Sequence, residues 1–358
     1  MHIPKMKRYK KISITLSLFT VSWLMQLLPA QAASFNCGKS KTTVEKLICS
    51  NGTVSKLDQK MQSVYQNAYK DTADPVGLKL DQQQWLKLRD TCKDATCLVG
   101  VYRTRLDKLK ALMTEPKPCF RLLERKWPEV KSGHYPVCVD FLKSLNSFCD
   151  EMPDTKWKKS ETGFKIMSPF KATPRVSCDW KVNPAVNTLK KPRWEALDPK
   201  AHLKVIQNLY QHYYRDPEEK WQPIPPDRLQ RINDGQTRLW HTRIDLDRDG
   251  QQEHVVRFDD LPCEHGEGSD FFGLPSQIAV VDDNASKIDA RYDYLNHGFD
   301  IVVHDDKSYV ITSLAGVQVK FESGRVGFRN SLELQEPFSA RGGYEKEMRS
   351  VCVFDYIK

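Results

Sequence analysis

The 358-residue sequence lacks several features that would assign it to a common class. It has one long hydrophobic run, near its N-terminus, and a mean hydropathy of -0.58, which excludes a protein with several membrane spans. With 17 Gly, 20 Pro and no internal repeat, it is neither collagen-like nor low in complexity. It contains no C-x-x-C, G-x-S-x-G or H-E-x-x-H motif, so thiol oxidoreductases, α/β-hydrolases and zinc metalloproteases find no signature here.

The first 32 residues have the pattern of a secretory signal peptide. Residues 5–11 carry five basic side chains, Ile12–Leu28 is apolar, and Ala30-Gln31-Ala32 is a small-residue cleavage site. The alternative is an uncleaved anchor, because the apolar run is long for a signal. No cysteine follows the small residues directly, so a lipid anchor is not expected. The sequence predicts a periplasmic or extracellular protein without a membrane span after cleavage.

The charge is distributed unevenly along the chain. Removal of the five basic residues of the signal lowers the formal net charge from +9 to +4, which leaves little support for nucleic-acid binding. Residues 33–115 carry 14 Lys/Arg and 9 Asp/Glu, residues 116–200 carry 17 and 10, and residues 201–358 carry 19 and 27. The basic residues 33–200 and the acidic residues 201–358 form either two solvated surfaces or two docking surfaces, of which the basic one could bind anionic envelope polymers.

Ten cysteines in an exported chain favour disulfides, and we expect five of them with no free thiol. Cys138 and Cys149 are eleven residues apart on a predicted helix, about 16 Å along its axis, so they cannot bond each other. Two pairings with Cys119 and Cys178 remain open. The cysteines are Cys37, Cys49, Cys92 and Cys97, then Cys119, Cys138, Cys149 and Cys178, then Cys263 and Cys352.

Hydrophobic periodicity and proline positions predict an α + β multidomain chain. Steps of three and four predict helices starting near Val54, Leu78 and Leu98, and hence a small disulfide-tied helical domain over residues 33–115. Fourteen of the 20 prolines lie between Pro116 and Pro226, which predicts an irregular Cys-rich connector over residues 116–200 with a helix at Val139–Cys149.

Residues 201–358 have an amphipathic helix from Leu203 and then a strand-like pattern of period two. We expect an antiparallel β-rich domain, with Cys352 on the last strand bonded to Cys263. The predicted strands are Leu239–Ile244, Glu253–Phe258, Gln277–Val281, Asp300–His304, Tyr309–Ser313, Val317–Phe321 and Val351–Tyr356.

The helical segment resembles the N-terminal domain of the LprI-like lysozyme inhibitor family of bacterial envelope proteins. The matching residues are Phe35-Asn36-Cys37, Val44-Glu45-Lys46-Leu47-Ile48-Cys49, Leu57-Asp58, Tyr65, Trp85-x-x-x-Arg89-x-x-Cys92 and Cys97-Leu98-x-x-x-Tyr102-x-x-Arg105. The resemblance covers about 80 residues and implies protein binding near lysozyme.

These motif residues are first of all a scaffold. A hairpin of the helices from Val54 and Leu78 would bring Cys49 near Cys92, which favours Cys49–Cys92 with Cys37–Cys97, or the crossed alternative. We expect the family residues Trp85, Tyr65 and Tyr102 to pack between helices and Arg89 to pair with Asp58 or a helix C-terminus, with Arg105 also structural.

The acidic turn Asp245-Leu246-Asp247-Arg248-Asp249-Gly250-Gln251-Gln252-Glu253 is the second informative motif. Asp245, Asp247, Asp249 and Glu253 offer carboxylates of the kind that Ca²⁺ prefers. Position twelve is Val256 instead of Glu, which argues against an EF-hand and favours a calcium turn between strands. The alternative is a β-hairpin whose charge is balanced by arginines. Calcium is therefore a candidate cofactor, and no organic cofactor is expected.

Nothing in the chain assembles into a nucleophile with a base, so we expect no enzyme. The acid-rich loops at 263–270 and 304–306 are candidate metal ligands or a site rim, and His241, His254, His297 and His304 are scattered without a zinc motif. The first hypothesis is an envelope binding protein that inhibits lysozyme. The alternatives are a calcium-stiffened module that binds glycan or anionic polymer, and a hydrolase site at His265 and Asp270.

Overall fold

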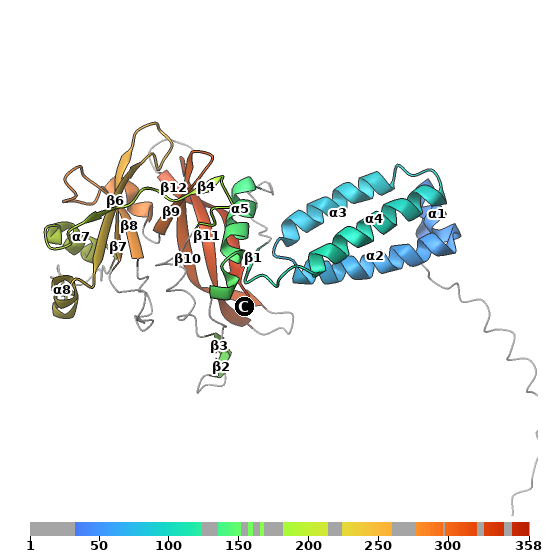
Figure 1. Cartoon of the computed structure of the whole chain (residues 1–358), viewed down its shortest axis with the longest axis horizontal. Coiled ribbons are helices and arrows are strands. Elements are labelled where there is room, and N and C mark those ends of the chain that lie inside the picture. Colours follow the sequence, from blue (N-terminus) through green and yellow to red (C-terminus); the bar gives the residue numbers. More distant parts are fainter. Residues whose placement is uncertain are drawn as a thin grey trace, which may run out of the picture. The chain divides into compact units, whose positions relative to one another are not determined.

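The computed structural model describes most of the chain after residue 32. The described residues are 33–123, 135–151, 157–159, 165–167, 182–213, 224–259, 276–295, 298–320, 326–339 and 346–357. Helices dominate up to residue 113, and antiparallel strands dominate from residue 120 onward (Figure 1). The predicted mixed α + β architecture is confirmed. In the described part of the chain, no helix is long and apolar enough to cross a membrane.

Four helices and a short 3₁₀ turn make up the N-terminal part. Side chains just before each helix accept backbone N–H groups that the helix leaves unpaired. Thr42 and Glu45 form a reciprocal capping box at α1, Asp74 accepts the Gly77 N–H at 2.8 Å before Pro75 at α3, and Asp94 caps α4. The elements are η1 (Cys37–Lys39), α1 (Thr43–Ser50), α2 (Gly52–Asp71), α3 (Pro75–Arg89) and α4 (Ala95–Met113). The periodicity predicted α2, α3 and α4 and missed α1.

A six-stranded antiparallel sheet forms one half of the β-rich part, in the order β1-β12-β11-β10-β9-β4. The helix α5 (Pro136–Asn146) covers one face and buries Phe141 against Phe354, with ring centroids 5.2 Å apart. The strands are β1 (Phe120–Leu122), β4 (Leu189–Lys190), β9 (Gly298–His304), β10 (Lys307–Lys320), β11 (Val326–Ser339) and β12 (Lys346–Tyr356).

A four-stranded antiparallel sheet forms the other half, in the order β5-β6-β7-β8. Its strands are β5 (Glu195–Leu197), β6 (Arg238–Ile244), β7 (Glu253–Asp259) and β8 (Ser276–Val281). One face packs against α7 (Leu203–Tyr213), and Ile232 of α8 (Pro226–Asn233) joins that core. The other face packs against the six-stranded sheet through a core that includes Val255, Ile278, Ile301 and Val310.

The remaining described elements are short. They are η2 (Cys149–Glu151), a separate two-stranded sheet of β2 (Trp157–Lys159) with β3 (Lys165–Met167), and η4 (Ala290–Leu295). One difference from the predicted strands concerns length. The expected pair Tyr309–Ser313 and Val317–Phe321 is the single strand β10, with a register shift between Leu314 and Val317. The strand β11 and the helix α8 were not predicted.

The predicted connector is not a separate region in the described residues. β1 pairs with β12, β4 with β9 and β5 with β6, so segments from residues 116–200 complete both larger sheets. The predicted helix Val139–Cys149 is α5, shifted toward the N-terminus. Prolines indicated irregular chain here, but two- and three-residue strands are too short to leave a periodic pattern.

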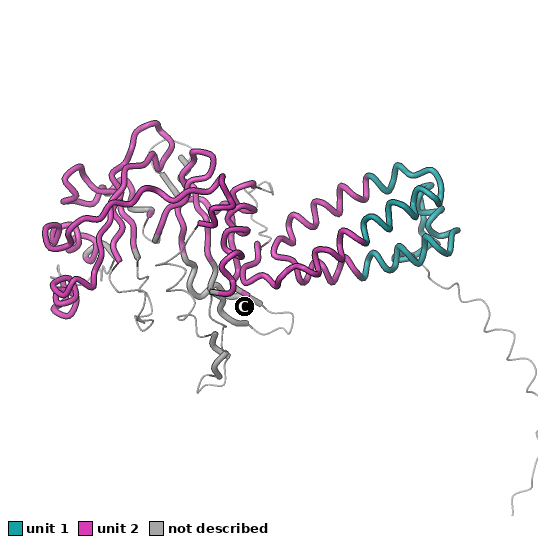
Figure 2. Tube along the Cα trace, in the orientation of Figure 1, with its two compact units in different colours: residues 1–63, 88–106 teal, residues 64–87, 107–358 magenta. Residues whose placement is uncertain are grey.

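The chain divides into two compact units, residues 1–63 with 88–106 and residues 64–87 with 107–358 (Figure 2). The boundary crosses α2, α3 and α4, so the predicted domain limit at residue 115 differs from this division. The core of the first unit includes Val44, Ile48, Val54, Leu98 and Tyr102. In the second unit, Ala68, Leu78 and Leu109 form a further buried cluster.

The disulfides of the helical part differ from both predicted pairings. Cys37 bonds Cys49, and Cys92 bonds Cys97, with sequence separations of 12 and 5. The prediction placed Cys49 directly before the first long helix. Instead the unpredicted α1 turns the chain back, so that Cys49 near its end meets Cys37 of η1. The second bond closes the turn between α3 and α4.

The disulfides of the β-rich part also correct the predictions. Cys119 bonds Cys149, as one of the two open pairings required, and Cys138 and Cys149 do not bond each other. The other bond of that pairing, Cys138–Cys178, was wrong, because Cys138 bonds Cys352. Cys352, however, bonds Cys138 and not Cys263, because α5 lies on the sheet that contains β12. Cys178 and Cys263 lie outside the described residues, so the expected fifth bond stays a prediction.

Candidate functional site

A buried carboxylate organises the first unit. Asp58 of α2 is 1% exposed, and its two oxygens accept the Ser34 N–H and the Tyr102 hydroxyl, each at 2.7 Å. Burial, followed by the hydrogen bond to Asp58, raises the pKa of Tyr102, which keeps its hydroxyl protonated as a donor. Asp58 therefore ties the chain before η1 to α2 and α4.

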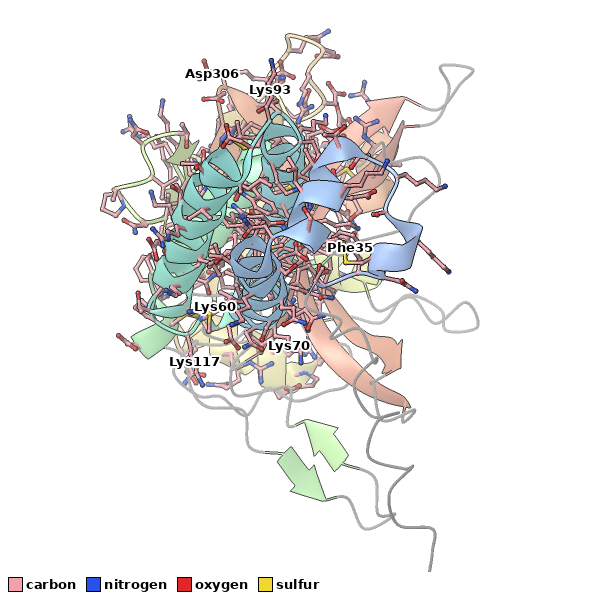
Figure 3. The ribbon with its side chains drawn as sticks, turned by 90° about the vertical axis from the view of Figure 1, so that its right-hand side faces the viewer. Phe35, Lys60, Lys70, Lys93, Lys117 and Asp306 are labelled. Atoms are coloured by element: carbon pink, nitrogen blue, oxygen red, sulfur yellow. A yellow bond between two sulfur atoms is a disulfide. The ribbon has the colours of Figure 1, made fainter. Side chains whose placement is uncertain are left out.

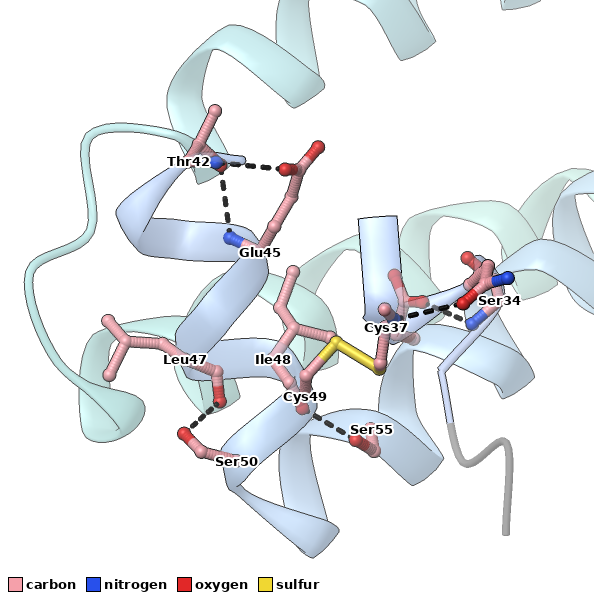
Figure 4. The surroundings of a disulfide bond; sticks show 12 residues. Ser34, Cys37, Thr42, Glu45, Leu47, Ile48, Cys49, Ser50 and Ser55 are labelled. Atoms are coloured by element: carbon pink, nitrogen blue, oxygen red, sulfur yellow. Dashed lines mark hydrogen bonds between the residues drawn. A yellow bond between two sulfur atoms is a disulfide. The ribbon is translucent and has the colours of Figure 1, made fainter. Parts of the chain in front are cut away.

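The first disulfide lies beside this network (Figure 4). Around Cys37–Cys49, Ser55 donates its hydroxyl to the Ile48 carbonyl at 2.5 Å, and Ile48 itself is fully buried. The capping box of Thr42 and Glu45 holds the other end of α1, with hydrogen bonds of 3.1 Å and 2.9 Å. The disulfide and these hydrogen bonds thus hold η1 and α1 in place.

The residues of the helical segment that match the family motif lie inside the fold. Trp85, Tyr102 and Arg105 are buried, as the scaffold interpretation predicted. Arg89 pairs with Asp90, at 2.7 Å from Nη2 to Oδ1, and not with Asp58, which was one of its two expected partners beside a helix C-terminus. These side chains build the segment and do not form an exposed recognition surface.

Lysines dominate the outer surface of the first unit. Lys60 and Lys93 extend outward from the helices in Figure 3. The exposed cationic side chains are Lys39, Lys41, Lys46, Lys56, Lys60, Lys93 and Arg103. Exposed carboxylates of this unit are those of Asp90 and Asp94, and Asp94 is engaged in capping α4. An acidic surface or a polyanion would be attracted to this exterior.

The acidic turn lies between β6 and β7 in the second unit. Ligand oxygens of Asp245, Asp247 and Glu253 lie within 4.8 Å of one another, the one such group of three found in the described part of the chain. Asp249 is not in this group; its N–H donates to Asp245 and Asp247 at 3.1 and 3.2 Å. Of the four carboxylates predicted for calcium, three converge.

Glu253 is the buried carboxyl group of this turn. Glu253 is 9% exposed, and burial raises its pKa above the usual range, while the Leu246 N–H at 2.7 Å opposes the shift. Tyr292 donates to Asp247 at 3.0 Å. Gly250, with φ 88°, and Arg248, with φ 64°, give the turn its left-handed backbone. A cation at this turn would relieve the repulsion among its carboxylates.

The hairpin alternative proposed that arginines balance the charge of this turn. Arg248 instead makes its contacts outside the turn. Its guanidinium donates to Glu336 at 2.7 Å and to the Ser308 carbonyl at 3.0 Å, and it stacks over Tyr309. Arg243 pairs with Asp283 and Arg257 with Asp259 and Asp300. In the described residues these arginines are engaged elsewhere.

Two histidines that the sequence left scattered are neighbours in the structure. His254 Nε2 is 3.2 Å from His241 Nδ1. His304 instead contacts Asp140 at 2.9 Å. His297, His265, Asp270 and the whole 263–270 loop lie outside the described residues. Only strand pairing places His241 beside His254, so no spacing rule could have found them.

Residues 36–109 match the family model described as Lysozyme inhibitor LprI. The helical segment is therefore LprI-like. Three curated relatives match over 85 residues at 32% identity: proteins named Lipoprotein LprI from Mycobacterium bovis and from two strains of Mycobacterium tuberculosis. The matches cover 23% of this chain and 43% of each relative, so the chain spans less than half the length of the curated relatives it matches. No solved structure matches the chain.

Proposed function

We propose that the LprI-like segment binds lysozyme and inhibits it. The observation that carries the proposal is the match of residues 36–109 to the lysozyme inhibitor family. The burial of Trp85, Tyr102 and Arg105 supports it, because the residues that define the resemblance are the ones that hold the helices together. Binding would then use the exposed exterior of the segment and not these buried side chains.

The charge of the exterior indicates which part of lysozyme it would meet. Lysozyme cleaves glycosidic bonds with two carboxyl groups in its cleft. Exposed lysines such as Lys39 and Lys41, next to the Cys37–Cys49 loop, are suited to an acidic cleft and not to a cationic outer surface. Inhibition by these residues would weaken as salt screens the charges.

The test is the lysis of a peptidoglycan suspension by animal-type lysozyme in the presence of residues 33–358. We expect slower clearing, and loss of the effect in a Lys39→Glu/Lys41→Glu variant. The matched control is Lys287→Glu/Lys307→Glu, which reverses two exposed lysines of the second unit. Unimpeded lysis with the unaltered chain would overturn the proposal, and loss of inhibition in the control alone would move the binding surface to the second unit.

We propose that the chain works outside the cytoplasm as a binding protein and not as an enzyme. Four disulfides among the described residues support export, since such bonds persist in oxidising compartments. Cleavage after Ala32 would leave Ala33 as the first residue. N-terminal sequencing of the protein from a periplasmic fraction tests this; an unprocessed N-terminus in the membrane fraction would contradict it.

A second candidate function is calcium binding at the acidic turn, and we propose it for Asp245, Asp247 and Glu253. The convergence of their oxygens within 4.8 Å and the raised pKa of Glu253 favour it. Bound calcium would stiffen the turn beside the two sheets, as a glycan-binding module would require. Its partners would then be envelope glycans or anionic polymers.

Calcium should raise the melting temperature of the chain, and chelator should reverse the increase. Asp245→Asn/Asp247→Asn should remove the response, whereas Asp227→Asn, an exposed acid on α8, should keep it. Identical melting curves with calcium and with chelator would reject this site.

A further inference from the structure

The first unit has many more cationic than acidic side chains. From residue 33 on, it contains nine Lys/Arg and four Asp/Glu, a formal net charge of +5. Its exposed cations make no ion pair in the part of the chain that the structure describes. They are Lys39, Lys41, Lys46, Lys56, Lys60, Lys93 and Arg103.

The four carboxylates are engaged within the unit and do not neutralise these cations. Asp58 is buried, and Glu45 accepts the backbone N–H groups of residues 41 and 42 at 2.6 and 2.9 Å. Asp90 pairs with Arg89, and Asp94 caps α4. The exterior therefore keeps a positive potential, which at physiological salt extends about 8 Å into the solvent and attracts anions.

Helix α2 shows the same imbalance along a single element. Within the first unit, its one acidic residue is the buried Asp58. Lys56 and Lys60 are exposed and one turn apart, and like charges at this spacing repel each other. In the second unit, by contrast, Lys108 has a carboxylate partner, with 3.0 Å between its Nζ and Asp81 Oδ1. An anion that lies across Lys56 and Lys60 would relieve their repulsion.

The exposed cations lie on different sides of the helical bundle. Lys93, in the turn between α3 and α4, and Lys60, on α2, point to different sides of it in Figure 3. A flat bilayer contacts one side only, whereas a flexible chain can pass from one side to another. Six of the seven exposed cations are lysines, which bind anions as point charges, without the fixed bidentate geometry of arginine. These features fit a long, flexible polyanion.

We propose that the first unit binds a flexible polymer whose repeats carry phosphate groups. Lysine is a common ligand of phosphate as a point charge, and a phosphodiester stays ionised over the pH range of an envelope. The proposal extends the binding role outside the cytoplasm that we proposed above. It needs neither calcium nor lysozyme, and it assigns the anionic polymer to the first unit and not to the acidic turn.

The test is titration of residues 33–358, purified without a tag, into end-labelled linear polyphosphate, followed by fluorescence anisotropy. If four phosphates are neutralised, the affinity should fall about 50-fold between 50 and 200 mM NaCl, by the slope known for single strands. Tripolyphosphate should bind at least about 100-fold more weakly, because it reaches few lysines at once.

Two pairs of substitutions on different elements test the contact surface. Lys56→Gln/Lys60→Gln on α2 and Lys93→Gln/Arg103→Gln at α4 should each lower the affinity for polyphosphate at least about tenfold at 100 mM NaCl, and each should reduce the salt dependence. All four side chains are exposed, so the variants should fold, and circular dichroism checks this.

The matched control is Lys287→Gln/Lys307→Gln, which removes two exposed lysines of the second unit and should leave the affinity and its salt dependence unchanged. Vesicles of phosphatidylcholine with phosphatidylglycerol distinguish the polymer from a membrane surface. Binding to vesicles without binding to polyphosphate would overturn the proposal, as would an equal loss of affinity in the control. No lysozyme is present and Lys39 and Lys41 are unaltered, so such a failure leaves the inhibition test independent.

Discussion

The disulfides of the two compact units join residues at very different separations along the sequence. In the first unit, disulfides join residues 12 and 5 positions apart, and the polar caps act within one helix or its turn. In the second unit, disulfides span 30 and 214 positions, and strands from residues 116–200 pair with strands near the C-terminus. The first unit is therefore built from local contacts, and the second depends on pairing between distant segments.

The largest effect is expected from opening the longest loop. Cys138→Ala/Cys352→Ala should lower the free energy of unfolding by about 5 kcal/mol, because a loop of this length restricts the unfolded chain most. After residue 32, every tryptophan lies in the second unit, so denaturant unfolding followed by tryptophan fluorescence reports the change. An unchanged midpoint would show that sheet pairing alone holds this unit.

Asp58→Ala should have the next largest effect, about 3 kcal/mol, and confined to the first unit. It leaves the half-buried Ser34 N–H and the buried Tyr102 hydroxyl without their acceptor. Hydrogen exchange of α1 and α4 amides measures it, with Tyr102→Phe as the milder control because one hydrogen bond to Asp58 remains. Faster exchange throughout the β-strands would contradict the separation of the two units.

Cys92→Ala/Cys97→Ala opens the shortest disulfide loop, which lies in the first unit. A loop of 5 positions restricts the unfolded chain little, so we expect a loss of about 2 kcal/mol. Exchange of the amides in α3 and α4 measures it. A loss as large as that from opening Cys138–Cys352 would remove the distinction between local and distant closure.

The smallest effect is expected in the response to acid. Burial alone would raise the pKa of Glu336, but hydrogen bonds from Arg248 and Arg349 hold it below the usual range. A carboxyl with a lowered pKa stabilises the fold above its unfolded pKa, about 4.3, and loses that contribution as pH falls.

Melting followed by tryptophan fluorescence from pH 7 to pH 3 tests this sign. Glu336→Gln should flatten the decline below about pH 5 for the second unit. Glu45→Gln is the control, since that residue caps α1 and affects the first unit alone. A steeper decline in Glu336→Gln would reverse the assigned sign.

The candidate sites show where sequence reasoning succeeded. The Asp245–Glu253 turn was found because its carboxylates alternate within nine residues, and three of them do converge. Trp85 and Tyr102 were expected between the helices as residues of the family motif, and both are buried. In both cases the signal is contained in a few neighbouring residues. The predicted partners of Cys49 and Cys92 were wrong because the prediction missed α1, which brings Cys49 back to Cys37, and the tight turn that brings Cys97 to Cys92. The predicted partner of Cys352 was wrong because the actual partner lies 214 positions away, on a helix that only packing brings to the sheet.

By itself, the sequence determined the local elements of this protein: three long helices, most strands of the two larger sheets and the acidic turn. Each follows from side-chain periodicity, capping residues and glycine positions, which act over a few residues. Only the tertiary structure decided that residues 116–200 complete the sheets, that Cys138 meets Cys352 and that His241 faces His254. These contacts join segments whose separation along the chain leaves no periodic trace, and packing of α5 and of adjacent strands selects them.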